Sequence, residues 1–461
     1  MLWRGLAVAV IGSLAAAASA AAYDPATEAR NFSKTTERAA IYSSPEGQLL
    51  LRRGGLANAL ASRQAQLADP ERSFSANLCA SGEDGCAGDP RLYDWGPKGY
   101  GLVEPVLWTA RNGATISGHV WATRAGPAER PGVVITNGSV QADEQMYWYA
   151  AQTLAKAGYV VLTWDPQGQG QSDVPGEGPD ANEGVPAQSD GRPFYDGTVD
   201  ALDFFLSTPG HPFSPRPSCE TGTSHAPKQQ RRVAARLNAA HNPFAHLLDR
   251  GRIGLAGHSY GAAGVSYVGQ WDPRVKAIVA WDNLGPADPA AGGRLGERPC
   301  PADPDARRPV PITKPALGLS ADYGLITTPY TADPDPLAKS AQSLEYSRAG
   351  VDTGQLVIRG GTHYEFSFIA NPAFGATLRG ADLTAWYTTA WFDKYVKGDQ
   401  TADARLLTAR WQDNFSFYYR SRLDIEGFTC EDLRAGCPGM VPGEGEWSYL
   451  SVATSPDAGT G

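Results

Sequence analysis

The sequence predicts an α/β protein in which a mostly parallel central sheet is covered by helices on both faces. Between residues 102 and 410, short apolar runs alternate with stretches of helical periodicity. Alternation of this kind over about 250 residues is typical of parallel strands joined by crossover helices. The strand candidates of this region are GVVIT (132–136), YVVLTW (159–164), RIGLAG (252–257), VKAIVAW (275–281), PALGLS (315–320) and QLVIRG (355–360).

Turn and cap residues predict the elements at the two ends of this region. VEPVLWTA and ATISGHVWAT flank Asn112-Gly113, a pair that accepts the positive φ of a tight turn, so 103–123 is expected to form a β-hairpin. Gly398 is expected to end a helix whose apolar face is buried. The residues that recur at helical spacing before it are Leu383, Trp386, Tyr387, Ala390, Trp391 and Tyr395.

The first 22 residues are predicted to be a cleaved secretory signal. Arg4 precedes a short apolar run at 6–18, and Ala18-Ser19-Ala20 offers small residues to a signal peptidase. The protein is therefore expected outside the cytoplasm, either secreted or periplasmic. Downstream, no run approaches the roughly 18 consecutive apolar residues of a membrane-spanning helix, so no membrane anchor is expected.

The remaining chain is expected to form one large α/β domain with an extension at each end. Residues 102–410 make up this domain, 23–101 precede it and 411–461 follow it. Loops that emerge beyond the carboxyl ends of parallel strands commonly border a ligand site. The candidates for such loops are three stretches rich in Gly, Pro and Asp, at 165–195, 209–230 and 283–314.

The charge balance argues against some classes of partner. The chain has a formal net charge of −9, with 40 Lys and Arg against 49 Asp and Glu. A protein that binds nucleic acid or anionic lipid shows a basic patch, and the sequence has none. No metal and no organic cofactor is expected, and the sequence leaves the oligomeric state open.

Six cysteines in an exported chain favour disulfide bonds. None of their spacings is the Cys-x-x-Cys of a structural zinc site. Two local pairs have the same spacing of seven residues, which leaves the last two cysteines to pair over a long range. The predicted disulfides are Cys79–Cys86, Cys430–Cys437 and Cys219–Cys300.

The segment RIGLAGHSYGAAG (252–264) places Ser259 between a predicted strand and a predicted helix. Gly257 and Gly261 flank the serine in a Gly-x-Ser-x-Gly pattern, and glycines at these positions allow the sharp turn of a nucleophile elbow. The five-residue pattern alone is weak in a chain with 52 glycines. Its position between strand and helix is what favours Ser259 as an activated nucleophile.

One histidine is in a position to serve as the base that this serine requires. Of the seven histidines, His363 alone lies C-terminal to Ser259, directly after the last predicted strand. We therefore predict that His363 takes the proton of the serine hydroxyl. His258 is expected to be structural, because a side chain beside the nucleophile points elsewhere in a tight elbow.

Two aspartates compete as the acid that would orient this histidine. Asp282 follows the strand VKAIVAW, and Asp322 lies just beyond PALGLS. Both are at strand ends, so spacing does not choose between them. The oxyanion hole is expected to use the backbone N–H of Tyr260 and a second N–H from the loop 137–140.

Four stretches in this order resemble the α/β-hydrolase superfamily: VVITNGS, GYVVLTWDPQGQGQS, GHSYGAAG and GGTHYEF. AWFDKYVKGD is similar to the closing helix of its dienelactone-hydrolase-like branch, which includes secreted cutinase-type esterases. The resemblance implies an α/β-hydrolase fold over 102–410. It also implies Asp322 as the acid, Ser139 as an oxyanion donor and Trp281 as a wall of the acyl pocket. Asn137 stands where the family commonly has histidine.

These observations predict a serine hydrolase that cleaves small or polymeric carboxylic esters through an acyl-enzyme. An exported peptidase or amidase with the same triad is one alternative, although the sequence shows no recognisable binding site for the terminus of a peptide substrate. A second alternative is a non-catalytic binding protein of the same fold. Binding alone does not require a serine, a histidine, an acid and an oxyanion loop together, so this alternative is disfavoured. The particular ester and its acyl length are not determined by the sequence.

Overall fold

A nine-stranded sheet forms the centre of the chain in a computed structural model. The strand order is β1-β2-β4-β3-β5-β6-β7-β8-β10. Strands β3 to β8 run parallel, whereas β1, β2 and β10 are antiparallel to their neighbours. Apart from a few single positions, the structure describes residues 63–73, 101–139, 143–181, 192–286, 310–321, 341–358, 361–368, 378–410, 415–418 and 441–443.

The strands of this sheet are β1 (Gly101–Thr109), β2 (Thr115–Thr123), β3 (Arg130–Thr136), β4 (Val160–Trp164), β5 (Leu248–His258), β6 (Val275–Trp281), β7 (Ala316–Ala321), β8 (Thr353–Ile358) and β10 (Phe415–Tyr418). A second, two-stranded sheet pairs β9 (Thr408–Arg410) with β11 (Val441–Gly443).

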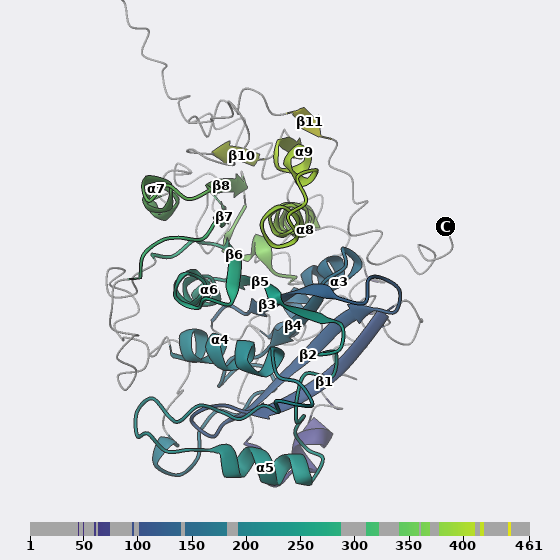
Figure 1. Cartoon of the computed structure of the whole chain (residues 1–461), viewed down its shortest axis with the longest axis vertical. Helices are drawn as coiled ribbons and strands as arrows, with labels where there is room; N and C mark the ends of the chain where they lie inside the picture. Colours follow the sequence, from purple (N-terminus) through teal and green to yellow (C-terminus); the bar gives the residue numbers. More distant parts are fainter. Residues whose placement is uncertain are drawn as a thin grey trace, which may run out of the picture.

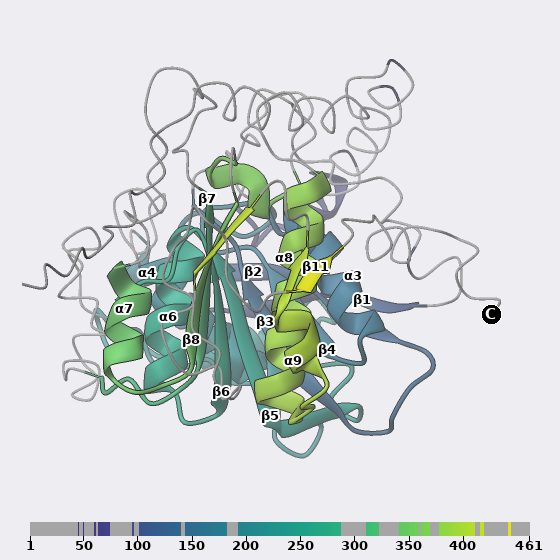
Figure 2. The same ribbon diagram turned by 90° about the horizontal axis from the view of Figure 1, so that it is seen from above.

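Helices cover both faces of the sheet, as Figures 1 and 2 show, with α4 and α6 on one face and α3 and α8 on the other. The α-helices are α3 (Trp148–Lys156), α4 (Arg192–Phe205), α5 (Ala226–Ala234), α6 (Tyr260–Trp271), α7 (Ala341–Arg348), α8 (Leu378–Phe392) and α9 (Ala402–Leu406). The shorter helical turns are η2 (Glu144–Tyr147), η3 (Gly178–Asp180), η5 (His363–Phe366) and η7 (Asp393–Lys397).

The alternation of side chains along β3 explains why the sheet needs both helical layers. Val133 and Ile135 pack in the core beneath α3 and α8, and Val134 packs in the core beneath α4 and α6. All three are fully buried. A strand that is apolar on both faces is stable only when both faces are covered, which is the usual state of a parallel sheet.

The structure confirms the predicted α/β class with its mostly parallel sheet. The hairpin forms as predicted, with β1 and β2 antiparallel and Gly113 at φ 88° in the turn. The helix predicted before Gly398 also forms, as α8 followed by η7, and it ends at Gly398, whose φ is 79°. One feature differs from the predicted segments: β10 comes from the stretch 411–461 and pairs with β8, so this stretch contributes a strand to the central sheet.

The carboxyl ends of the parallel strands meet along one edge of the sheet. Thr136 of β3 is in register with Trp164 of β4 and with Gly257 of β5, and His258 is in register with Trp281 of β6. Residues that follow these strands are therefore neighbours in space although they are far apart in the chain. This edge holds the predicted site.

Candidate active site

Ser259 lies in a sharp turn between β5 and α6. Its backbone angles are φ 56° and ψ −118°, a conformation that residues other than glycine rarely adopt. Its N–H donates a hydrogen bond to the carbonyl of Trp281 at the end of β6 (2.9 Å). The strained backbone at this position is what a nucleophile elbow requires, and it agrees with the strand-to-helix placement predicted from the sequence.

The two glycines of the elbow are required by close backbone contacts. A Cβ at Gly261 would lie 2.3 Å from the carbonyl oxygens of Thr136 and Asn137. A Cβ at Gly257 would lie 2.4 Å from the carbonyl oxygen of Gly261. Because any larger residue would push the turn away from β3, the glycines keep Ser259 beside the loop that follows that strand.

His363 lies in η5, in the loop that follows β8, and pairs with Asp282. Its Nδ1 hydrogen-bonds to Oδ2 of Asp282, whose side chain is almost completely buried. Asp282 directly follows β6 and donates its own N–H to the carbonyl of Leu319 (2.7 Å). The ring of His363 also lies beside that of His258, with 4.7 Å between the centroids, which places it next to the elbow.

This pairing favours Asp282 as the acid, whereas the family resemblance implied Asp322. The acid in contact with His363 is Asp282, the alternative that spacing alone had left open, and Asp322 lies outside the described residues. Strand order alone does not make this choice, because β6 is the direct neighbour of β5, which carries Ser259, but β7 is the direct neighbour of β8, which leads to His363. The contact forms because the loop after β8 brings His363 back to the elbow, where its carbonyl accepts a hydrogen bond from His258.

The predicted oxyanion donors belong to segments that lie close to Ser259. Tyr260 is the first residue of α6, and the N–H groups of a first helical turn have no acceptor within the helix. The second segment is the oxyanion loop, defined here as residues 137–139, which follows β3. A Cβ at Gly138 would lie 3.2 Å from Cβ of Ser259, so Gly138, the residue before the predicted donor Ser139, lies beside the serine.

Tyr147 and His258 join the oxyanion loop to the loop after β8 that carries His363. Gly138 N–H donates to the hydroxyl of Tyr147 (3.2 Å), which is 2.7 Å from Nδ1 of His258. Nε2 of His258 is 2.8 Å from the carbonyl oxygen of His363 and donates to it. His258 is therefore structural, as predicted, and it positions the backbone of the predicted base. Tyr147 carried no signal in the sequence, since only the fold brings η2 to this place.

Trp281 does not have the role that the resemblance implied. It is fully buried in the core between the sheet and α8, and its indole N–H donates to Thr388 of that helix (3.0 Å). Its ring stacks on Tyr147, with 6.1 Å between centroids and 12° between planes. Trp281 therefore supports the site from within the core, and its prediction as a wall of the acyl pocket is corrected.

Burial and mutual repulsion raise the pKa of two acidic groups in the segments that follow β3 and β4. Burial, reinforced by the charge of Glu144, raises the pKa of Asp143 to about 7. The same two causes, in the same order, raise the pKa of Asp165 well above its ordinary value. Asp165 accepts a hydrogen bond from Asn137 Nδ2 (3.2 Å). The raised pKa of Asp165 disfavours a full negative charge beside a loop that is predicted to hold an oxyanion.

Within the described part of the chain, no group of three or more His, Cys, Asp or Glu side chains could hold a metal ion. Among those same residues, no helix has the length and apolar character needed to cross a bilayer. Cys219 is buried and disulfide-bonded. The other five cysteines lie outside the described residues, so the three predicted pairs stay predictions.

Comparison with known proteins adds no family assignment. No protein-family model matches the chain, and no curated protein matches it. What the chain can do must therefore be argued from its own residues.

We predict that Tyr147→Phe lowers kcat by about tenfold, the kinetic equivalent of roughly 1.4 kcal/mol. The substitution keeps the ring against Trp281 but removes the hydroxyl that joins Gly138 to His258. KM should change little, because the substitution acts on groups that are predicted to bind the oxyanion of the transition state. Steady-state kinetics on an ester substrate would measure both constants.

Tyr159→Phe is the matched control for this prediction. Tyr159 is also fully buried, and its hydroxyl donates to Asp393 at the start of η7 (2.9 Å). Both variants should lose about 1 kcal/mol of unfolding free energy. Only Tyr147→Phe should lose kcat, and equal kinetic effects of the two variants would reject the positioning role of Tyr147.

Proposed function

We propose that this protein is an exported serine hydrolase of the α/β-hydrolase type that cleaves carboxylic esters through an acyl-enzyme. The observation that carries the proposal is the constellation at one edge of the sheet. It combines Ser259 in an elbow, His363 beside it and a buried Asp282 on Nδ1 of that histidine. Its export and its disulfide pairs remain proposals from the signal-like first 22 residues and from the cysteine pattern.

In the proposed first step, Oγ of Ser259 attacks the carbonyl carbon of the ester while Nε2 of His363 takes the hydroxyl proton. Asp282 accepts the hydrogen bond of Nδ1–H, which fixes the tautomer and stabilises the imidazolium that forms. The carbonyl oxygen becomes negatively charged and is bound by the N–H groups of Ser139 and Tyr260. Donors of this kind are worth about 2.7–4 kcal/mol each in the transition state.

Collapse of the tetrahedral intermediate breaks the bond to the alcohol oxygen, which leaves with the proton held by His363. The acyl group then remains on Oγ of Ser259. A water molecule gives a proton to His363 and attacks the acyl carbon. The second tetrahedral intermediate releases the carboxylic acid, and the proton returns to Ser259. No metal and no organic cofactor takes part in these steps.

The test is an activity panel in which each acyl group is offered both as a p-nitrophenyl ester and as a p-nitroanilide. The ester of each pair should be turned over clearly faster, and the preferred acyl length would identify the class of substrate. Faster cleavage of the anilides would favour the peptidase or amidase alternative. No turnover of either series, together with no labelling by a fluorophosphonate, would favour a non-catalytic binding protein.

A further inference from the structure

We propose that the N-terminal segment of residues 63–73 positions the oxyanion loop through Arg72, and that Arg72 and Gln169 are positioning residues of the reaction. This inference rests on the proposed function and extends it. It assigns a role to a part of the chain that precedes the α/β domain. The contacts that carry it run from the segment to the loop after β4, and from there to Gly138.

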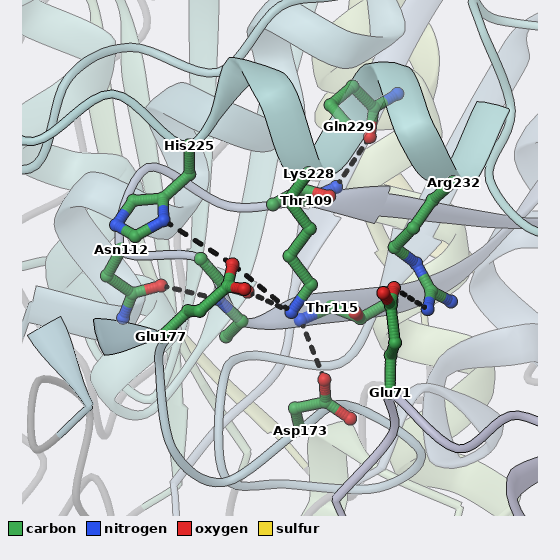
Figure 3. Close-up of polar contacts among 12 residues, drawn as sticks. Glu71, Thr109, Asn112, Thr115, Asp173, Glu177, His225, Lys228, Gln229 and Arg232 are labelled. Atoms are coloured by element: carbon green, nitrogen blue, oxygen red, sulfur yellow. Dashed lines mark hydrogen bonds and ion pairs between the residues drawn. The ribbon is translucent and has the colours of Figure 1, made fainter. Parts of the chain in front are cut away.

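The N-terminal segment is held on α5 by a buried ion pair. Arg232 is fully buried, and its two terminal guanidinium nitrogens, Nη1 and Nη2, contact the carboxylate of Asp69 at 3.0 and 2.5 Å. Burial opposes ionisation of Asp69, but hydrogen bonds and the charge of Arg232 outweigh it and hold the pKa of this carboxyl below its ordinary value. Figure 3 shows the junction, where Glu71 of the segment also reaches Arg232.

Arg72 extends from this segment to the buried carboxylate of Asp173. Its Nε donates to Oδ1 of Asp173 at 2.8 Å, and the N–H of Ser73 donates to the same oxygen at 3.1 Å. Oδ2 of Asp173 accepts from the N–H of Thr115 in the hairpin (3.0 Å). Without Arg72, this carboxylate would be buried without its ion-pair partner, which is costly.

Asp173 closes the β4 loop, defined here as residues 165–173. The carbonyl of Asp173 accepts from the N–H of Gly168 (2.9 Å), which draws the two ends of the loop together. Oγ of Ser172 donates to the carbonyl of Asp165 (2.6 Å). At Gly170, with φ 48°, a Cβ would lie about 2.2 Å from the Asp165 carboxyl group. The loop is therefore tightly folded, and a shift at Asp173 is passed on to its centre.

Gln169 at the centre of the β4 loop contacts the oxyanion loop. Its Nε2 donates to the carbonyl oxygen of Gly138 at 2.8 Å, and its side chain is buried. The carbonyl of Gly138 and the N–H of Ser139 belong to one planar peptide group, in which they point in opposite directions. Holding the carbonyl therefore fixes the direction of the N–H that is predicted to bind the oxyanion.

The deciding experiment is a double-mutant cycle on kcat with Arg72→Ala and Gln169→Ala. Arg72→Ala should lower kcat by about tenfold with KM nearly unchanged, a smaller loss than the 10²- to 10³-fold that follows complete loss of an oxyanion donor. Because Arg72 acts through Gln169, adding Arg72→Ala to Gln169→Ala should cause no further loss. Additive losses would mean that Arg72 is only a structural anchor and would overturn the proposal.

Arg231→Ala is the matched control. Arg231 belongs to the same junction, but it pairs with the carboxylates of Glu71 (2.9 Å) and Glu177 (3.8 Å), both of which are partly exposed to solvent. This variant should keep the wild-type kcat, whereas Arg72→Lys, which retains the charge, should recover part of the loss. If Arg72→Ala does not fold, the cycle with Arg72→Lys decides the question by the same criterion.

Amide hydrogen exchange tests the positioning independently of any substrate. Peptides that cover 137–147 and 165–174 should exchange faster in Arg72→Ala than in the wild type and in Arg231→Ala. A wild type without ester activity would refute the proposed function, yet faster exchange would still support the contact pathway. Unchanged exchange in an active enzyme would refute the pathway alone.

Discussion

Ser259→Ala is expected to abolish labelling by a fluorophosphonate and to lower kcat on the best ester by on the order of 10⁶-fold, as removal of the catalytic serine does in subtilisin. The reason is that Ser259 is the residue at the sharp turn of the elbow and lies beside Gly138 of the oxyanion loop. Labelling can be followed by intact-protein mass spectrometry, and kcat by release of p-nitrophenol.

Ser266→Ala provides the control for this prediction. Ser266 lies on the same helix, α6, is fully buried and donates its hydroxyl to the carbonyl of Ala262 (2.6 Å). Its loss should lower the melting temperature but leave labelling intact. If Ser259→Ala still reacts with the probe at the wild-type rate, the nucleophile lies elsewhere and the proposed function is wrong.

Asp282→Asn is expected to lower kcat by about 10⁴-fold while the fold is retained, as the equivalent change does in serine proteases. An asparagine can present an N–H to Nδ1 of His363. This interaction would favour the tautomer that carries its proton on Nε2. That nitrogen could then no longer take the proton of Ser259. Steady-state kinetics and a thermal unfolding curve of the same preparation would separate this effect from loss of folding.

Asp322→Asn is the comparison that decides between the two candidate acids. Since Asp282 is the carboxylate that contacts His363, the Asp322 variant should keep a kcat close to that of the wild type. If the Asp322 variant were inactive and the Asp282 variant nearly normal, with equal melting temperatures in both, the acid would be the one that the family resemblance favoured. The contact seen between Asp282 and His363 would then be unproductive.

The class of the fold and the position of the elbow could be predicted because both depend on local patterns. Apolar runs such as GVVIT are buried on both faces in any covered parallel sheet. Gly257 and Gly261 flank a serine that only a glycine-bordered turn can hold in its conformation. His363 followed from chain order, since it is the one histidine after Ser259.

The choice of acid and the supporting residues depended on how loops from distant parts of the chain meet, which no local pattern specifies. Asp282 and Asp322 both follow a strand, and the two became distinguishable only by the contact between Asp282 and Nδ1 of His363. Trp281 has a large apolar side chain of the kind that lines ligand pockets. Its ring instead faces the core, because its indole N–H bonds to Thr388 of α8, and only the packing of that helix against the sheet decides this.

The sequence by itself determined the α/β class and the elbow at Ser259, because apolar periodicity and glycine positions are patterns of residues close together in the chain. It also identified the predicted base, because only one histidine follows Ser259. Only the tertiary structure decided that Asp282 pairs with His363. It alone also showed that Tyr147 and His258 join two loops, and that Arg72 contacts Asp173 about a hundred residues away. Contacts of this kind form between residues far apart in the chain, so they exist only once strands and loops have been brought to the same edge of the sheet.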